Sequence, residues 1–383
     1  MQTDSARKRI HSLQTMLALS AGLLSAAGCQ SARLDIARKQ FYAGHPESAV
    51  VELETTDIQD NDRVLVMMER GMMRQAAGDH EGATADWLDA AARSEKLDYI
   101  SVSQQTGSLT VNEQLLAYRG PPYEQVLVHA FAAQSFLSLG QIDDAAVEAR
   151  RAIQKLESRG KYPDTAFVRY LAGACLAAAG DDPGAAVQYR IASELSAVVD
   201  IDPGTGMPAP EGQTLPPRQA GTPVVVIIGI GRSSAAPGAW RNDRWGGNPH
   251  AVIESRGRPL GRTYTLSALP VLQEETRRVT EAKRAARTAT RIAFKETVSH
   301  AVRNENEALG EFLRVLLYAL ETPDRRQWVT LPRWLQAGCV RLPEPAESIT
   351  VRGMGRGSLA EARDVPLTPP GRSGIRFAFV RFY

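Results

Sequence analysis

The fold of the first half of the chain follows from one stretch, Val126-Leu-Val-His-Ala-Phe-Ala-Ala-Gln-Ser-Phe-Leu-Ser-Leu-Gly140-Gln-Ile-Asp-Asp-Ala145-Ala-Val147. Apolar residues recur at helical spacing before Gly140 and again after it. A glycine between two such runs fits the left-handed residue that ends a helix, and an alanine five residues later lets the next helix pack closely. The stretch therefore predicts two antiparallel helices joined at Gly140.

The same glycine–alanine pair, five residues apart, occurs four times. The pairs are Gly44 and Ala49, Gly78 and Ala83, Gly140 and Ala145, and Gly180 and Ala185. The first two glycines are 34 residues apart, the period of tetratricopeptide repeats, and the next interval, 62, leaves room for a 28-residue insertion around residues 98–122. The pattern resembles tetratricopeptide repeats over about residues 31–197, which implies stacked helix pairs with a concave groove for a partner. A generic antiparallel helical bundle is the alternative.

The N-terminus has the order of parts of an export signal. Arg7, Lys8 and Arg9 precede an uncharged apolar stretch over residues 13–28, which is short for a membrane-spanning helix. It ends in Leu24-Ser-Ala-Ala-Gly28-Cys29, which resembles a bacterial lipobox. That resemblance implies a signal peptide over residues 1–28 and acylation of Cys29. Gln30, in place of Asp, resembles an outer-membrane address. An ordinary secretory signal or a short membrane anchor is the alternative.

Composition excludes several classes of protein. The chain has 383 residues, of which 43% are hydrophobic and 23% charged, so wholesale disorder is excluded. Three cysteines cannot form a disulfide framework, and no apolar stretch beyond the N-terminus is long enough for a multi-span membrane protein. Residues 29–200 carry 16 Lys and Arg against 25 Asp and Glu, whereas residues 223–383 carry 25 against 15. Opposite net charges favour either docking of the two halves or a basic half that faces an anionic partner; two separately solvated surfaces are the alternative.

The repeats end at a segment rich in proline and glycine, residues 201–222, which we expect to be a linker. After it, the β-branched run Pro223-Val-Val-Val-Ile-Ile-Gly-Ile230 predicts a buried strand. Further short strands are expected at residues 251–253, 263–266, 338–342, 348–351 and 375–382, on both sides of a long Arg-rich helical stretch that begins at Leu272. The fold class expected is therefore mostly α: a tetratricopeptide-like α-solenoid over residues 29–200, followed by a smaller α+β domain over residues 223–383 with a basic helix.

Catalytic and cofactor motifs are missing from the sequence. The glycines of Gly229-Ile-Gly231-Arg-Ser-Ser234 follow a strand, but no helix begins there, so a plain turn is favoured over a dinucleotide site. The six histidines have no metal-binding spacing, and no phosphate loop or nucleophile elbow is present. Cys175 has the surroundings of a core residue, although it could pair with Cys339 across the two halves. We therefore expect no enzyme, no cofactor and no metal.

Two further stretches carry a more specific resemblance. The first is Tyr118-Arg-Gly-Pro-Pro-Tyr-Glu124, which runs into Gly140 and then Ala146-Val-Glu-Ala-Arg-Arg-Ala152. The second is Thr322-Pro-Asp-Arg-Arg-Gln-Trp-Val-Thr-Leu-Pro332. Together with the order of parts, they are similar to a family of poorly characterised bacterial lipoproteins with tetratricopeptide repeats and a C-terminal α+β domain. The resemblance implies an envelope component without enzymatic activity. The candidate partner-binding residues in these stretches are Tyr118, Arg119, Tyr123, Asp324, Arg325 and Trp328. A structural role for the second stretch, with Trp328 packed inside the protein, is the favoured alternative.

The function expected from these observations is that of a lipid-anchored scaffold or adaptor. It would face the periplasm from the outer membrane and bind a protein partner through the repeat groove. Nucleic acid is not an expected partner, because the basic helix follows an export signal. The alternative function is a cell-wall- or anion-binding module, or an unrecognised envelope enzyme, centred on the Arg-rich C-terminal domain. An anionic cell-wall polymer is then the candidate partner.

Overall fold

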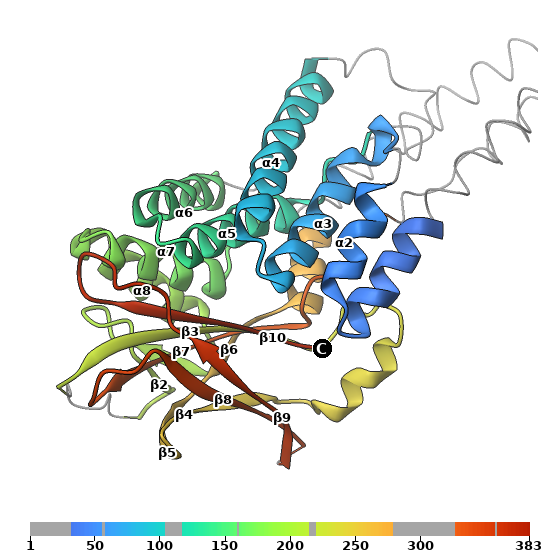
Figure 1. The fold of residues 1–383 in the computed structure, drawn as a ribbon. Helices are drawn as coiled ribbons and strands as arrows, with labels where there is room; N and C mark the ends of the chain where they lie inside the picture. Colours follow the sequence, from blue (N-terminus) through green and yellow to red (C-terminus); the bar gives the residue numbers. More distant parts are fainter. Residues whose placement is uncertain are drawn as a thin grey trace, which may run out of the picture.

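The computed structural model of the chain describes residues 32–55, 58–103, 117–158, 161–213, 220–278, 326–356 and 358–383. Its first half consists of helices in antiparallel pairs (Figure 1). They are the helix over residues 32–42 with α2 (Pro46–Glu54), α3 (Arg63–Ala77) with α4 (His80–Ser103), α5 (Pro122–Ser138) with α6 (Ile142–Glu157), and α7 (Ala166–Ala178) with α8 (Asp182–Leu195). A short 3-10 helix, η1 (Asp60–Asp62), precedes α3.

All four predicted turn glycines lie between the two helices of a pair. Their φ angles are positive, at +89° for Gly44, +85° for Gly78, +73° for Gly140 and +84° for Gly180. A side chain with a β-carbon is strained in this left-handed conformation, so glycine ends the first helix of each pair at little cost. The alanine five residues after each glycine is buried, as expected for close packing of the second helix. The predicted helical-repeat fold is therefore confirmed.

The second half contains strands in three sheets. A small antiparallel pair joins β1 (Val199–Ile201) to β2 (Pro208–Pro210). The second sheet has the order β10-β3-β7-β6, and its strands are β3 (Thr222–Ile230), β6 (Tyr264–Ala268), β7 (Trp334–Leu342) and β10 (Arg376–Phe382). The third has the order β5-β4-β8-β9, and its strands are β4 (His250–Ser255), β5 (Arg258–Arg262), β8 (Ser348–Gly355) and β9 (Ser358–Pro366). A 3-10 helix, η3 (Ala239–Arg244), follows β3.

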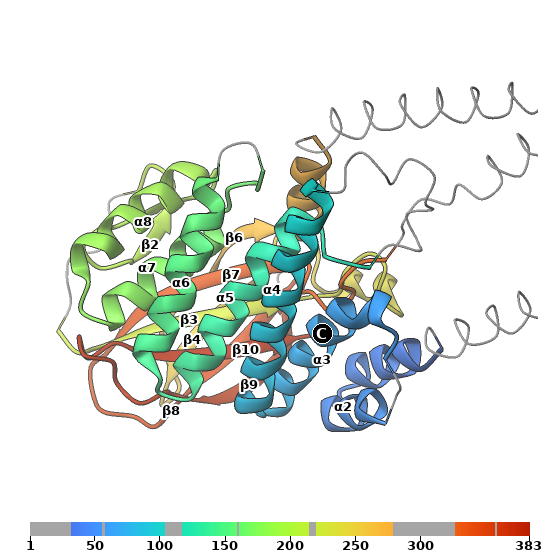
Figure 2. The same cartoon turned by 90° about the horizontal axis from the view of Figure 1, so that it is seen from above.

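Strand β3 is buried on both faces, which explains its continuous apolar sequence. Val225 and Ile227 belong to one core with the helices, whereas Val224 and Val226 belong to a second core between the two large sheets. Strand β10 runs parallel to β3 and β7 runs antiparallel to it. The molecule thus has three layers, with helices on one face of the β10-β3-β7-β6 sheet and the third sheet on the other (Figures 1 and 2).

Several details differ from the expectations. Part of the expected linker over residues 201–222 forms β2, and Ile201 and Ala209 are buried. The prolines of β2 are tolerated because the strand lies at the edge of its sheet, where a missing N–H removes no hydrogen bond to a neighbouring strand. Strands β5 and β9 were not expected, since their largely exposed, polar sequences lack an apolar alternation. Of the Arg-rich helical stretch, the structure describes a helix over residues 269–278; the rest lies outside the described residues.

Candidate functional site

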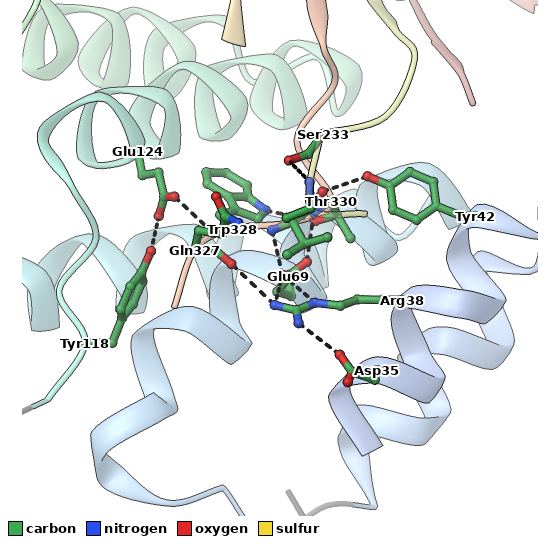
Figure 3. A network of polar contacts seen from close by, with 12 residues as sticks. Asp35, Arg38, Tyr42, Glu69, Tyr118, Glu124, Ser233, Gln327, Trp328 and Thr330 are labelled. Atoms are coloured by element: carbon green, nitrogen blue, oxygen red, sulfur yellow. Dashed lines mark hydrogen bonds and ion pairs between the residues drawn. The ribbon is translucent and has the colours of Figure 1, made fainter. Parts of the chain in front are cut away.

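The helical pairs contact the C-terminal domain through hydrogen bonds to its main chain. Two buried carboxylates bind three consecutive amides of the segment that leads into β7 (Figure 3). Glu124 Oε1, on α5, accepts a hydrogen bond from the Trp328 amide at 3.0 Å. Glu69, on α3, accepts one from the Val329 amide at 2.8 Å through Oε1 and one from the Thr330 amide at 3.1 Å through Oε2. Both glutamates have no exposed surface, so their charge must be compensated inside the protein.

Arg38 supplies that compensation for Glu69. Its Nε and Nη2 donate to Glu69 Oε1 at 2.9 and 2.6 Å, and Nη2 also donates to the Gln327 carbonyl at 3.3 Å. The Arg38 side chain lies on the helix over residues 32–42 and is 13% exposed. A buried carboxylate with a guanidinium and two amides around it is a satisfied ion pair, and removal of any partner is costly.

Glu124 has a different environment. Its donors, besides the Trp328 amide, are two phenols: Tyr118 donates to Oε2 at 2.5 Å and Tyr123 donates to Oε1 at 3.0 Å. Burial raises the pKa of Glu124 to about 7, even though these hydrogen bonds favour the ionised form. The same burial raises the pKa of the Tyr123 phenol well above its ordinary value. The contact between α5 and the C-terminal segment therefore contains a group that titrates near neutral pH.

The indole of Trp328 fills the space between the two glutamates and the helices. Its ring lies 5.2 Å from the Trp87 ring on α4 and 5.7 Å from the Phe131 ring on α5, centroid to centroid. Its Nε1 donates to Thr330 Oγ1 at 2.9 Å, so the polar atom is satisfied although the residue is only 1% exposed. Nearby, the Tyr42 phenol donates to the Val329 carbonyl at 2.7 Å. Residues 326–331 are thus held by three different helical pairs.

A second contact lies at the other end of the helical stack. Ser267 Oγ, on β6, lies 2.6 Å from Thr165 Oγ1 and accepts a hydrogen bond from the Phe167 amide at 3.2 Å, at the start of α7. Arg372 pairs with Asp143 at 2.7 Å at the surface. The first helix of every pair therefore touches the C-terminal domain, and the inner face of the stack is covered by it. Sequence analysis left open whether the two oppositely charged halves dock; in the structure they contact each other through these residues.

Of the predicted site residues, three lie close together in the structure, one lies apart and three lie outside the described residues. Tyr118, Tyr123 and Trp328 meet around Glu124, and each is at most 5% exposed. All three contact other parts of the same chain, as the structural alternative for Trp328 predicts. The concave groove in which a partner was expected is filled by the chain's own residues. Arg119 lies apart and pairs with Asp98 at 3.0 Å. Cys29, Asp324 and Arg325 lie outside the described residues.

Sequence reasoning missed Glu69 as a central residue. The available signal was its position in Val64-Leu-Val-Met-Met-Glu-Arg-Gly-Met-Met73, where the two charged residues Glu69 and Arg70 interrupt an apolar run of the kind that a buried helix requires. A charged residue in such a run indicates a buried partner elsewhere in the fold. Its partners, Arg38 and the amides near Val329, carry no periodic signal of their own.

The remaining polar groups of interest are structural. His129 Nδ1 lies 2.7 Å from Glu148 Oε2, and both side chains are buried, as expected for a packed histidine. Cys175 and Cys339 are free thiols, and burial raises the pKa of each to about 12. Within the described ranges, no group of three or more His, Cys, Asp or Glu is arranged to hold a metal ion. Among those same residues, no helix is both long and apolar enough to cross a membrane.

Comparison with known proteins gives distant structural likenesses. No protein-family model matches the chain, and no curated protein matches it either. The structure is similar to MamA MSR-1 C2, with 18% identity and a TM-score of 0.29 over 43% of this chain and 75% of that one. It is similar to a protein from Podosopora anserina with nearly identical TPR-like repeats, with 14% identity and a TM-score of 0.30 over 43% and 74%. It is also similar to a tetratricopeptide repeat protein from Parabacteroides merdae, with 12% identity and a TM-score of 0.17 over 42% and 77%. Likenesses this distant are confined to the helical part and support no inference about function.

Proposed function

We propose that the chain is a lipid-anchored scaffold of the cell envelope that binds a protein partner and catalyses no reaction. The observation that carries this proposal is the use of the buried charged groups. Glu69 and Glu124 bind the amides of Val329 and Trp328, so they join the helical pairs and the C-terminal domain into one body instead of facing a reaction space. The buried polar groups of the helical stack bind other parts of the same chain. Such a stack is suited to present its outer surface to other proteins.

The covered inner face changes where a partner binds. Because Trp328 and its neighbours fill the space beside α3, α4 and α5, a partner of this form of the chain uses the outer surface of the helical stack. Entry into the inner face would require removal of a fully buried indole, which costs several kcal/mol, about 3–5 by analogy with large core truncations.

Membrane attachment through Cys29 is the part of the proposal with the simplest test. In the full chain, Cys29→Ser removes the thiol that the lipobox resemblance marks for acylation. Labelling with a radioactive fatty acid should then be lost, and the protein should move from the membrane fraction to the soluble fraction. Continued labelling of the variant contradicts lipid anchoring. A Gln30→Asp variant tests the outer-membrane address: it should remain acylated but fractionate with the inner membrane.

Partner binding is tested by crosslinking the full chain in intact cells of its source, followed by purification and mass spectrometry. The proposal expects one discrete protein partner, recovered in stoichiometric amounts and retained when the purified components are mixed. Recovery of wall fragments or lipid alone contradicts it.

A second candidate function is binding of an anionic cell-wall polymer, and one observation favours it. Arginines gather around the carboxyl ends of the parallel strands β3 and β10, the edge at which ligands bind in parallel sheets. They are Arg232, Arg241, Arg244, Arg363 and Arg381. Burial, with the positive charge of neighbouring arginines, lowers the pKa of Arg232 and of Arg381. Glu361 pairs with Arg244 and Arg363 and offsets part of the charge. Sedimentation of the full chain with purified wall, lost in Arg241→Gln, would favour this function.

A further inference from the structure

Exposed aliphatic side chains recur at one position of the helical repeats. The position lies seven residues after each turn glycine, and it is occupied by Val51 on α2, Ala85 on α4, Val147 on α6 and Val187 on α8. The three valines are 59%, 43% and 45% exposed, respectively, and Ala85 is exposed as well. Val51, Val147 and Val187 are called the valine row below.

The valine row faces directly away from the core. In each second helix, the residues two before and two after the row position are buried: Ala49 and Leu53 on α2, Ala145 and Ala149 on α6, and Ala185 and Tyr189 on α8. Residues four apart lie on one face of a helix, and the residue midway between them lies about 200° around the axis from each. The row position is therefore the most outward-facing one on each second helix, opposite the side that packs on the first helices.

Neither helix formation nor packing explains valine at this position. Valine is a poorer helix former than alanine, glutamate or lysine, because its branched β-carbon loses rotamer freedom against the preceding turn. At an outward position it also leaves apolar surface in water. A single exposed valine is ordinary, but the same residue at the equivalent position of three of four helical pairs forms a pattern along the stack.

Acidic side chains precede the row position in the first three pairs, whereas the exposed arginines Arg150, Arg151 and Arg190 follow it by about one turn in the last two. Glu47, Glu81 and Asp143 are exposed and lie four residues, or one helical turn, before the row position in the first three pairs. Asp143 also pairs with Arg372 at the surface. Residues 29–200 as a whole carry 16 basic against 25 acidic residues. A surface that complements this one presents aliphatic side chains, with lysine or arginine beside Val51 and Ala85 and with aspartate or glutamate beside Val187.

We propose that the valine row is the docking surface for a protein partner whose contact surface is aliphatic, with basic side chains opposite Val51 and acidic side chains opposite Val187. This inference rests on the proposed scaffold function and names the surface it uses. The covered inner face is consistent with it, because the C-terminal domain lies against the first helices of the pairs while the row positions on the second helices stay exposed.

The test places a photocrosslinking amino acid in the full chain, in cells of its source, at residue 51, 147 or 187. A fourth chain carries it at residue 359, because Leu359 is 48% exposed but lies on β9, in the third sheet. The proposal expects an adduct with the same protein from all three row positions and none from residue 359. Combined Val147→Asp and Val187→Asp should lower the adduct yield at residue 51 by about tenfold or more, whereas Leu359→Asp should leave it unchanged.

The outcomes separate this inference from the scaffold function. If a partner is captured through residue 359 but not through the row, the docking surface is wrong and the scaffold function stands. If no protein is captured from any position, the scaffold function itself fails. An adduct made only with a second copy of the chain, or one unaffected by the two Val→Asp changes, overturns the inference. Unchanged thermal unfolding of the Asp variants checks that they remain folded.

Discussion

Glu69 Oε1 on α3 lies 2.8 Å from the main-chain nitrogen of Val329, a residue 260 positions later in the chain. The bond is made to the backbone, so it does not depend on the identity of the Val329 side chain. It joins the second helical pair to the segment before β7, so that a carboxylate of the repeats contacts the main chain of the C-terminal domain. The two halves therefore share one core, and changes in this contact affect the stability of both.

Replacing Glu69 with alanine should destabilise the protein strongly. The change leaves the Arg38 guanidinium and the amides of Val329 and Thr330 without their acceptor in a buried site. Loss of one partner of a buried ion pair costs about 3–5 kcal/mol in the free energy of unfolding. Urea denaturation measures the change. Asp89→Ala, which breaks an exposed pair with Arg93, is the control and should cost at most about 0.5 kcal/mol. A loss for Glu69→Ala no larger than that of the control contradicts the role assigned to Glu69.

The stability of the protein should fall as pH rises from about 4.5 to 7 because of Glu124. Burial raises the pKa of this carboxyl from 4.5 to about 7, so the folded chain holds the proton more tightly than the unfolded chain does. The stabilising contribution is complete below pH 4.5 and is lost as the pH passes 7. Its size is on the order of 3 kcal/mol.

Glu124→Gln isolates this contribution. The amide resembles the protonated carboxyl: its oxygen accepts from the Trp328 amide and its NH2 group donates to the Tyr118 oxygen. The variant should match the native protein at low pH, exceed its stability at pH near 8 and lose the slope between. Unfolding by urea at a series of pH values measures both curves. Glu81→Gln, at an exposed position, should keep the native slope. Parallel curves for Glu124→Gln and the native chain are the contrary result.

Two tryptophans allow a direct comparison of buried and exposed rings. Trp328 is 1% exposed and packs against the Trp87 and Phe131 rings, whereas Trp240 is 76% exposed. Trp328→Ala should lower the free energy of unfolding by about 3–5 kcal/mol, and Trp240→Ala by less than about 0.5 kcal/mol. The two variants remove the same atoms, so chemical denaturation of the pair measures the packing alone. Equal effects would mean that Trp328 does not join the two halves.

The turn glycines should be sensitive to a single methyl group. Gly180 has a φ of +84° and open space around the position of a β-carbon, so Gly180→Ala tests backbone strain without a steric clash. The expected loss is about 1–2 kcal/mol in the free energy of unfolding. Gly247 also has open space but no positive φ. Gly247→Ala should be neutral or stabilising by about 0.4–1 kcal/mol. Thermal unfolding measures both changes: the unfolding temperature should fall for Gly180→Ala and should stay the same or rise for Gly247→Ala, relative to the native chain.

Local patterns predicted the secondary structure well where one residue type controls a conformation. Gly44, Gly78, Gly140 and Gly180 were identified as helix ends from the helical apolar runs around them and the alanine five residues later, and all four have the left-handed conformation. The apolar run of β3 was recognised because both faces of that strand are buried. Strands β5 and β9 escaped prediction because they are held by pairing with β4 and β8 and not by apolar alternation in their own sequences.

The contact site was only partly visible in the sequence. Tyr118, Tyr123 and Trp328 were singled out, but as candidate partner-binding residues, and nothing in the sequence joined them to Glu69 or placed Glu124 between them. Ser267 was not singled out at all, although its hydroxyl meets Thr165 at 2.6 Å. Such contacts link residues about 100 to 260 positions apart, and no short-range period encodes them.

The helical pairs, the turns between them and the buried central strand could therefore be predicted from short stretches of the sequence. These features depend on residues within one or two helical turns, or within one strand, and the conformational limits of glycine and the periods of helix and strand act at that range. Long-range packing, in contrast, determines that residues 326–331 of the chain itself fill the inner face of the stack and that the valine row stays at the surface. That outcome depends on which distant surfaces satisfy the buried carboxylates of Glu69 and Glu124. A buried carboxylate must form hydrogen bonds or ion pairs, and the packing of the whole chain determines which groups lie close enough to form them.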